Sequence, residues 1–66
     1  MREDYRERFR ILGLRIAYYR KMRGMTQEQF AEALQVSRQA VSRWESGRSY
    51  PEVDKILYIC NRYAGA

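Results

Sequence analysis

The residues with the clearest chemistry are hydrogen-bond donors in the segment SRQAVSRWES, residues 37–46. At about 100° per residue in a helix, its polar side chains fall within an arc of roughly 140°, and apolar residues occupy the opposite side. The polar set is Arg38, Gln39, Ser42 and Arg43, and the apolar set is Ala40, Val41 and Trp44. Arg and Gln make paired hydrogen bonds to guanine and adenine in the major groove of DNA. The segment therefore predicts a helix with a buried face and a base-reading face, Ser42 being the weaker candidate.

Two short helices joined by a tight turn are predicted to hold this face. Thr26 and Gln29 have the T-x-x-Q spacing of a capping box, which starts a helix at Gln27. Its apolar residues, one helical turn apart, are Phe30, Ala31 and Leu34. Ser37 is a second N-cap, so the next helix runs from Arg38 to about Ser46 and stops at Gly47. Helices this close must cross steeply, as in a helix-turn-helix.

A longer helix is predicted ahead of this pair, over residues 3–23. Its apolar stripe, spaced by three and four, is Phe9, Leu12, Ile16, Tyr19 and Met22. Gly13 lies inside the stripe and costs roughly 1 kcal/mol relative to Ala, so residues 1–9 are predicted to form an N-terminal arm or a helix extension. Gly24 suits the left-handed position that ends a helix.

A fourth helix is predicted to begin with Pro51 at its first position, where the missing N–H is no loss. Its predicted buried residues are Val53, Ile56, Leu57, Ile59, Cys60 and Tyr63. Residues 1–66 contain no internal repeat and no linker, so they predict one all-α domain of four helices around one core.

The composition favours a polyanionic partner and argues against a metal or catalytic site. The chain of 66 residues carries a net charge of +5, and only about 60% of its unfolded surface is buried on folding, which leaves little room for a catalytic cleft. Cys60 is the only cysteine and there is no histidine. We therefore expect a buried thiol, no disulfide, no metal, no cofactor and a reducing cytoplasmic location. No signal peptide, transmembrane span or small-molecule site is evident.

The predicted helix-turn-helix also places groups against phosphate. The N-terminus of the helix that begins at Gln27 has free N–H groups and a dipole that attract anions, and Thr26 and Gln27 lie there. Arg48, just beyond the second helix of the pair, supplies a charged contact. Such contacts orient the protein without reading sequence.

These features resemble the phage-repressor-like helix-turn-helix family, the xenobiotic-response-element type of transcriptional regulator. The resemblance covers residues 11–63 and rests on LGLRIAYYRKMRGMTQEQFAEAL, VSRQAVSRWESGRSYP and the apolar last helix. It implies a lambda-repressor-like fold of four helices, or of five in a longer chain. It also implies a bacterial or phage protein that has no catalytic activity and binds double-stranded operator DNA as a two-fold homodimer.

Carried over by position, the resemblance implies that Arg38, Gln39 and Arg43 contact base edges, with Ser42 a weaker candidate. The phosphate contacts that it implies are Gln27, Ser37 and Arg48. Arg20 and Glu45 match a pair that bridges the first and third helices, with the Arg also near a phosphate.

The chain departs from the family pattern at two places. Gln35 stands in the turn where Gly or Asn is usual, and a residue with a Cβ at positive φ is strained by roughly 1 kcal/mol or more. Either the turn has another shape or the strain is tolerated. A fifth helix that contributes to dimerisation is replaced by AGA, residues 64–66, so the chain is either a fragment or pairs through other surfaces, such as the N-terminal arm.

Two other classes of function compete with DNA binding. The same fold can serve as a protein-interaction module whose basic helix face meets an acidic partner. A basic amphipathic segment on a membrane is disfavoured, because the first helix lacks a large apolar face and carries the acidic residues Glu3, Asp4 and Glu7.

Overall fold

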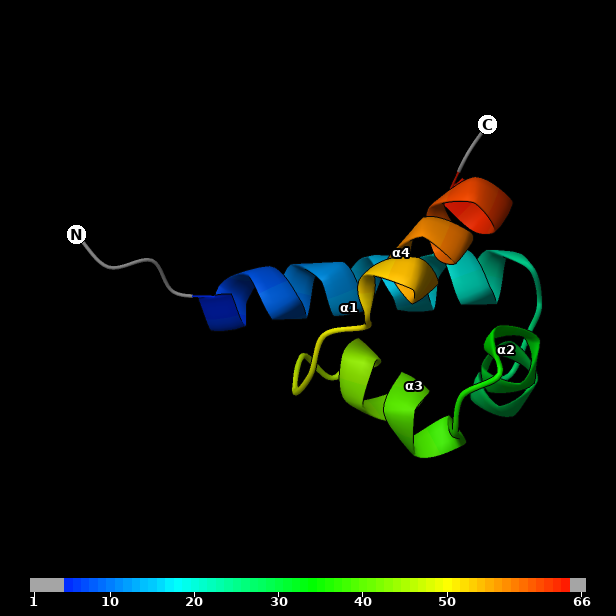
Figure 1. Cartoon of the computed structure of the whole chain (residues 1–66), viewed down its shortest axis with the longest axis horizontal. Coiled ribbons are helices and arrows are strands. Elements are labelled where there is room, and N and C mark those ends of the chain that lie inside the picture. Colours follow the sequence, from blue (N-terminus) through cyan, green and yellow to red (C-terminus); the bar gives the residue numbers. More distant parts are fainter. Residues whose placement is uncertain (1–4, 65–66) are drawn as a thin grey trace.

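The computed structural model describes residues 5–64, which form helices and no strand. The elements are α1 (Tyr5–Met22), α2 (Gln27–Leu34), α3 (Arg38–Glu45), α4 (Val53–Ile59) and a π-helical turn, η1 (Cys60–Ala64). In Figure 1, α1 runs along the molecule, with α2 and α3 on one side and α4 on the other. The predicted all-α fold is confirmed. Residues 1–4 of the predicted arm lie outside the described residues, and residues 5–9 belong to α1.

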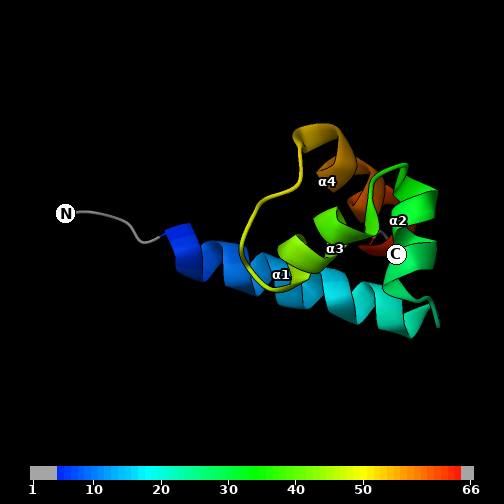
Figure 2. The same cartoon turned by 90° about the horizontal axis from the view of Figure 1, so that it is seen from below.

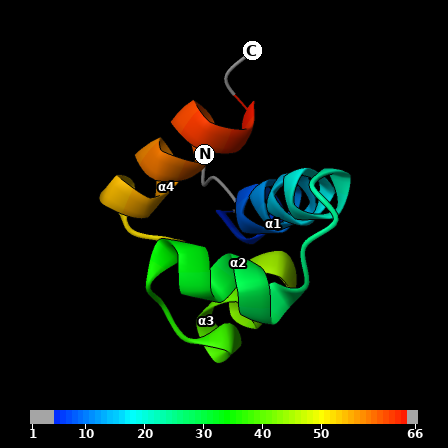
Figure 3. The ribbon, with the colours of Figure 1, turned by 90° about the vertical axis from the view of Figure 1, so that its right-hand side faces the viewer.

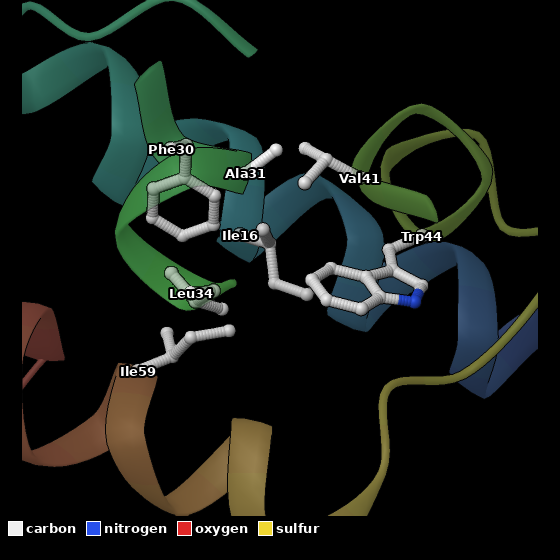
Figure 4. Packing of buried hydrophobic residues seen from close by; sticks show 7 residues of the cluster. All are labelled: Ile16, Phe30, Ala31, Leu34, Val41, Trp44 and Ile59. Carbon is white, nitrogen blue, oxygen red and sulfur yellow. The ribbon is translucent and has the colours of Figure 1, made fainter. Parts of the chain in front are cut away.

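Side chains from all four α-helices form the hydrophobic core. Phe30, Val41 and Ile16 are the largest that are fully buried, and Trp44 is 6% exposed. The remaining core residues are Ala31, Leu34 and Ile59. Figure 4 shows Ile16 of α1 between the Phe30 side of the core and the ring of Trp44. The prediction that Trp44 is a core residue is confirmed.

Gly13 lets α1 and α3 approach closely, and it does not interrupt the helix. A Cβ built on Gly13 would lie 2.1 Å from the backbone oxygen of Trp44 and 3.0 Å from that of Glu45. Only a residue without a Cβ fits between the two backbones. Figure 2 shows α3 against α1 in this region. The loss of helix propensity at Gly13 is therefore offset by the packing that its missing side chain allows.

The N-termini of α2 and α3 have the predicted caps. The Thr26 hydroxyl accepts from the Gln29 amide at 3.0 Å, and the Gln29 side chain accepts from the Thr26 amide at 2.9 Å, which confirms the capping box. The Ser37 hydroxyl accepts from the Ala40 amide at 3.1 Å. Both short helices therefore begin at residues that satisfy otherwise unpaired N–H groups.

Three helices end in the same hydrogen-bonded motif. A residue one or two positions past each helix adopts positive φ, at Gly24 (67°), Gln35 (60°) and Gly47 (78°). The next amide then donates to a carbonyl five residues back: Met25 to Arg20 at 3.1 Å, Val36 to Ala31 at 3.0 Å and Arg48 to Arg43 at 2.9 Å. This is the Schellman arrangement, in which glycine is usual at the left-handed position. The turn between α2 and α3 thus keeps the usual shape and tolerates the strain of Gln35.

The predicted apolar stripe of α1 is correct except at its end. Ile16 is buried, and Leu12 and Tyr19 pack against the core. Met22 is 66% exposed, so its predicted burial is wrong. The helix ends at Met22, and the chain then turns toward α2 (Figure 3).

Several predictions for the last helix are wrong. Pro51 is buried but precedes the N-cap Glu52, and α4 begins at Val53. Val53 and Leu57 are 70% and 57% exposed, and Cys60 is exposed as well. Of the predicted residues, Ile59 is buried in the core, Tyr63 of η1 packs against it and Ile56 is half-buried.

Arg23 fastens the C-terminal turn to the end of α1. Its guanidinium donates to the backbone oxygen of Arg62 at 3.0 Å and lies 5.2 Å from the centre of the Tyr63 ring. The Tyr63 ring lies 5.2 Å from that of Phe30, a spacing typical of attractive aromatic pairs. The turn η1 is therefore anchored to both α1 and the core.

Replacing Gly13 by Ala should destabilise the domain. The substitution gains about 1 kcal/mol of helix propensity, but the added Cβ meets rigid backbone atoms and forces α1 and α3 apart, which costs about 3 kcal/mol. We expect a net loss of about 2 kcal/mol in the free energy of unfolding, measured by urea titration. In Gly24→Ala the new Cβ has no neighbour within 4 Å, so this control should lose only about 1 kcal/mol, from backbone strain. Equal losses in both variants would contradict the proposed close approach.

Replacing Gln35 by Gly should stabilise the domain. Relief of the left-handed strain raises the free energy of unfolding by about 1–2 kcal/mol. The greater freedom of glycine in the unfolded chain lowers it by about 0.4–1 kcal/mol. The thermal midpoint should therefore rise. Gln35→Val should lower it, because a β-branched residue at positive φ is a genuine outlier. A fall of the midpoint in both variants would contradict this assignment.

Candidate nucleic-acid interface

The face of α3 that carries the donors lies outside the core. Arg38, Gln39 and Arg43 are exposed and Ser42 is half-buried. On the other side of the helix, Val41 is fully buried and Trp44 nearly so. The two faces that the sequence pattern separated are therefore separated in the structure, and the core holds α3 with its polar side turned outward.

An ion pair between α1 and the last residue of α3 holds the helix that carries this face in place. The Arg20 guanidinium donates to both carboxylate oxygens of Glu45, from Nε at 2.7 Å and from Nη2 at 3.0 Å. Its Nη1 donates to the backbone oxygen of Met25 at 2.8 Å. The two side chains are only 11% and 9% exposed. The geometry is the paired, planar one that guanidinium makes with carboxylate.

The hydrogen bonds to Glu45 raise the pKa of Arg20 above its usual value, more than burial lowers it. A raised pKa of a basic group stabilises the folded state at every pH below the unfolded value, and this contribution is lost only in strong alkali. The Arg20 guanidinium therefore keeps its charge up to strongly alkaline pH.

Gln27 joins this pair to the start of α2. Its side-chain nitrogen donates to Glu45 Oε1 at 3.0 Å, so Glu45 holds groups from both α1 and α2. The sequence pattern did not reveal this bond, because the spacing of Gln27 and Glu45 carries no local signal. The position of Gln27 at the first residue of α2 leaves its second N–H available beside the helix N-terminus.

The other predicted phosphate residues also lie at helix ends. The Thr26 and Ser37 hydroxyls accept bonds from their own helices, and each keeps its O–H as a donor. Arg48 is exposed and follows the Schellman turn at Gly47. A Cβ at Gly47 would lie 3.0 Å from the Arg10 Cα, so this turn packs directly on α1, which positions Arg48 beside it.

Within residues 5–64 there is no cluster of metal-ligating side chains and no helix suited to spanning a membrane. In the same part of the chain, every buried side-chain nitrogen or oxygen has a hydrogen-bond partner. The polar groups that face solvent on α3 are thus distinct from those that hold the fold together.

Removing one partner of the buried pair should be costly. Arg20→Ala leaves the Glu45 carboxylate buried with only Gln27 beside it, and we expect a loss of about 3–5 kcal/mol in the free energy of unfolding. Glu7→Ala is the matched control, because its pair with Arg10 spans 2.6 Å but both side chains are more than half exposed. Such exposed pairs contribute at most about 1 kcal/mol. Similar losses in the two variants, measured by urea titration, would contradict the structural role of Arg20.

Comparisons with known proteins agree with this geometry. A family model described as Helix-turn-helix matches residues 16–63. The HTH-type transcriptional activator BcrR of Enterococcus faecalis is 51% identical to this chain over 37 residues. That match covers 56% of this chain and 18% of the Enterococcus protein, so the chain corresponds to a small part of a longer relative. With the buried Arg20–Glu45 pair, the two capped helices and the outward face of α3, the matched residues show that the chain belongs to the helix-turn-helix family of the xenobiotic-response-element type.

Proposed function

We propose that the chain recognises operator DNA by placing α3 in the major groove, within the DNA-binding transcription regulation that its family performs. The single observation that carries this proposal is the outward face of α3, where Arg38, Gln39 and Arg43 are exposed and the opposite side is buried. Paired donors of this kind distinguish base pairs by their edges.

The core and the ion pair support such a role because they hold α3 rigidly. Base recognition needs donors placed to within a fraction of an ångström, and sites on rigid helices achieve this better than sites on loops. Val41 and Trp44 seat α3 on the core, and Glu45 ties its end to Arg20 and Gln27. The backbone of α3 therefore needs little ordering when DNA binds.

The phosphate contacts are proposed at the N-termini of α2 and α3 and just beyond the C-terminal end of α3. Thr26, Gln27 and Ser37 lie at the N-termini of α2 and α3, where N–H groups and hydroxyl donors favour an anion. Arg48 lies at the other end of α3 and supplies a full positive charge. Contacts at both ends would fix the depth and direction of α3 in the groove. Arg20 is held by Glu45 and is proposed only as a secondary phosphate contact.

Two copies are proposed to act together on an inverted repeat. The eight residues of α3 span about 12 Å, and base pairs are spaced 3.4 Å apart. One copy therefore reads only a few base pairs, too few for a unique site. Two copies related by a two-fold axis would double that length, with half-sites about one helical turn apart. The name of the Enterococcus relative, a transcriptional activator, supports a role in controlling transcription.

Two arginine variants separate base reading from phosphate binding. On the best duplex selected from a random pool, Arg43→Ala should lose about 1–3 kcal/mol of discrimination at one base position. Arg48→Ala should weaken binding to every duplex alike and reduce the slope of log K against log salt by about one unit. Fluorescence anisotropy against matched and scrambled duplexes at several salt concentrations measures both effects.

Equal losses from the two variants on all sequences would contradict the assignment of roles. Arg62→Ala is a suitable control, because Arg62 is an exposed arginine on η1, away from α3. It changes the net charge by the same amount as the other two variants. It should therefore leave base discrimination unchanged and alter the salt slope by less than Arg48→Ala does.

A further inference from the structure

The outer face of α1 carries an apolar stripe that the fold does not cover. Ile11, Leu14, Tyr18 and Met22 are 43%, 56%, 58% and 66% exposed. They are spaced by three and four residues, the interval at which side chains share one side of a helix. Single exposed apolar residues are ordinary, but a continuous row marks an interaction surface.

The stripe is separate from the proposed DNA-binding surface. At about 100° per residue, its members fall within an arc of roughly 80°. Gly13, which contacts α3, lies about 140° from the centre of this arc, and the core residue Ile16 about 160° from it. A partner on the stripe would therefore approach the side of α1 that faces away from α3 and the core.

Basic side chains border the stripe on both edges. Arg15 lies just beyond Met22 around the helix, and Lys21 and Arg10 lie just beyond Leu14 on the other edge; all three are exposed. Glu7, the one acidic residue on the line of the stripe within α1, is paired with Arg10 at 2.6 Å. The stripe is thus an apolar seam with Arg15 on one edge and Lys21 on the other, where the charge of Arg10 is neutralised by Glu7.

The surface near Ile11 is hollowed. A shallow depression beside the stripe is lined by Glu7, Arg8, Ile11, Leu12, Arg15 and Tyr50. Tyr50 is itself half exposed and stacks on Phe9 at 4.9 Å between ring centres. An apolar side chain from a partner would find an aromatic wall and a guanidinium at the same place.

We propose that this face of α1 docks an acidic amphipathic helix of another protein, whose apolar residues lie on the stripe and whose Asp and Glu side chains meet Arg15 and Lys21. A row spaced by three and four residues is the geometry of a helix-to-helix seam. Opposite charges along the edges of such a seam select the partner and its orientation. The inference is independent of the proposed role of α3.

The charge pattern and the narrow arc disfavour two other partners for this face, a second copy of the chain and a membrane surface. Two copies of α1 laid on each other would set basic edges against basic edges, which is destabilising. Insertion into an anionic membrane surface requires a larger apolar face than an arc of about 80°. The acidic helix alone satisfies both the apolar seam and its two positive edges.

The test uses two synthetic helical peptides with the same apolar seam, one with Glu and one with Lys at its edges. The full chain should bind the Glu-edged peptide at least about tenfold more tightly, by isothermal titration calorimetry without DNA. Leu14→Ser should weaken this binding about tenfold, because it removes one of the four apolar contacts of the seam. Leu57→Ser is the matched control, since Leu57 is 57% and Leu14 56% exposed, and it should leave binding unchanged.

A charge reversal tests the edges directly. Arg15→Glu with Lys21→Glu should reverse the preference between the two peptides, and the thermal midpoint checks that the variant is folded. Equal binding of both peptides, or no binding of either, would overturn the proposal. Self-association in sedimentation that Leu14→Ser abolishes would overturn it in favour of a second copy. Binding to phosphatidylglycerol vesicles that Leu14→Ser abolishes would overturn it in favour of a membrane.

Discussion

The buried ion pair of Arg20 and Glu45 is the interaction on which the arrangement of the domain depends. It joins residues that are far apart in the sequence and, through Gln27 and the Met25 carbonyl, gathers α1, the start of α2 and the end of α3 at one point. A buried pair contributes stability only when its remaining hydrogen bonds are satisfied, and here all three guanidinium nitrogens have acceptors. The pair therefore joins α1, α2 and α3 at one point and fixes the orientation of α3.

The close approach of α1 and α3 at Gly13 makes this ion pair possible. Because no Cβ separates α1 from the backbone of Trp44 and Glu45, the carboxylate reaches Arg20 while Trp44 enters the core. The Schellman turn at Gly47 then brings the chain back against Arg10. Three contacts along one helix thus hold α3 by its buried side, and its polar side needs no internal partner. A small core suffices to present a rigid donor face.

Much of the fold was predictable because its signals are local. Capping residues Thr26 and Ser37, the glycines after α1 and α3, and the two-faced pattern of α3 each depend on a few neighbouring residues. The errors arose where burial depends on distant parts of the chain. The stripe of α4 was placed too broadly, because the sequence does not reveal which side of a short helix is buried, and Cys60 and Leu57 are exposed in the structure. The bond between Gln27 and Glu45, and the role of Gly13, likewise become visible only when three helices are in place.

The role of α3 in DNA recognition can be tested by titrating the isotopically labelled chain with its selected operator duplex and following the amide chemical shifts. We expect the largest shifts at Gln27, from Ser37 to Arg43, and at Arg48, on one side of the molecule. The amides of Leu14, Tyr18 and Leu57 should change little. Shifts concentrated on the outer face of α1 or on α4, with α3 unaffected, would show that α3 is not the element that reads DNA.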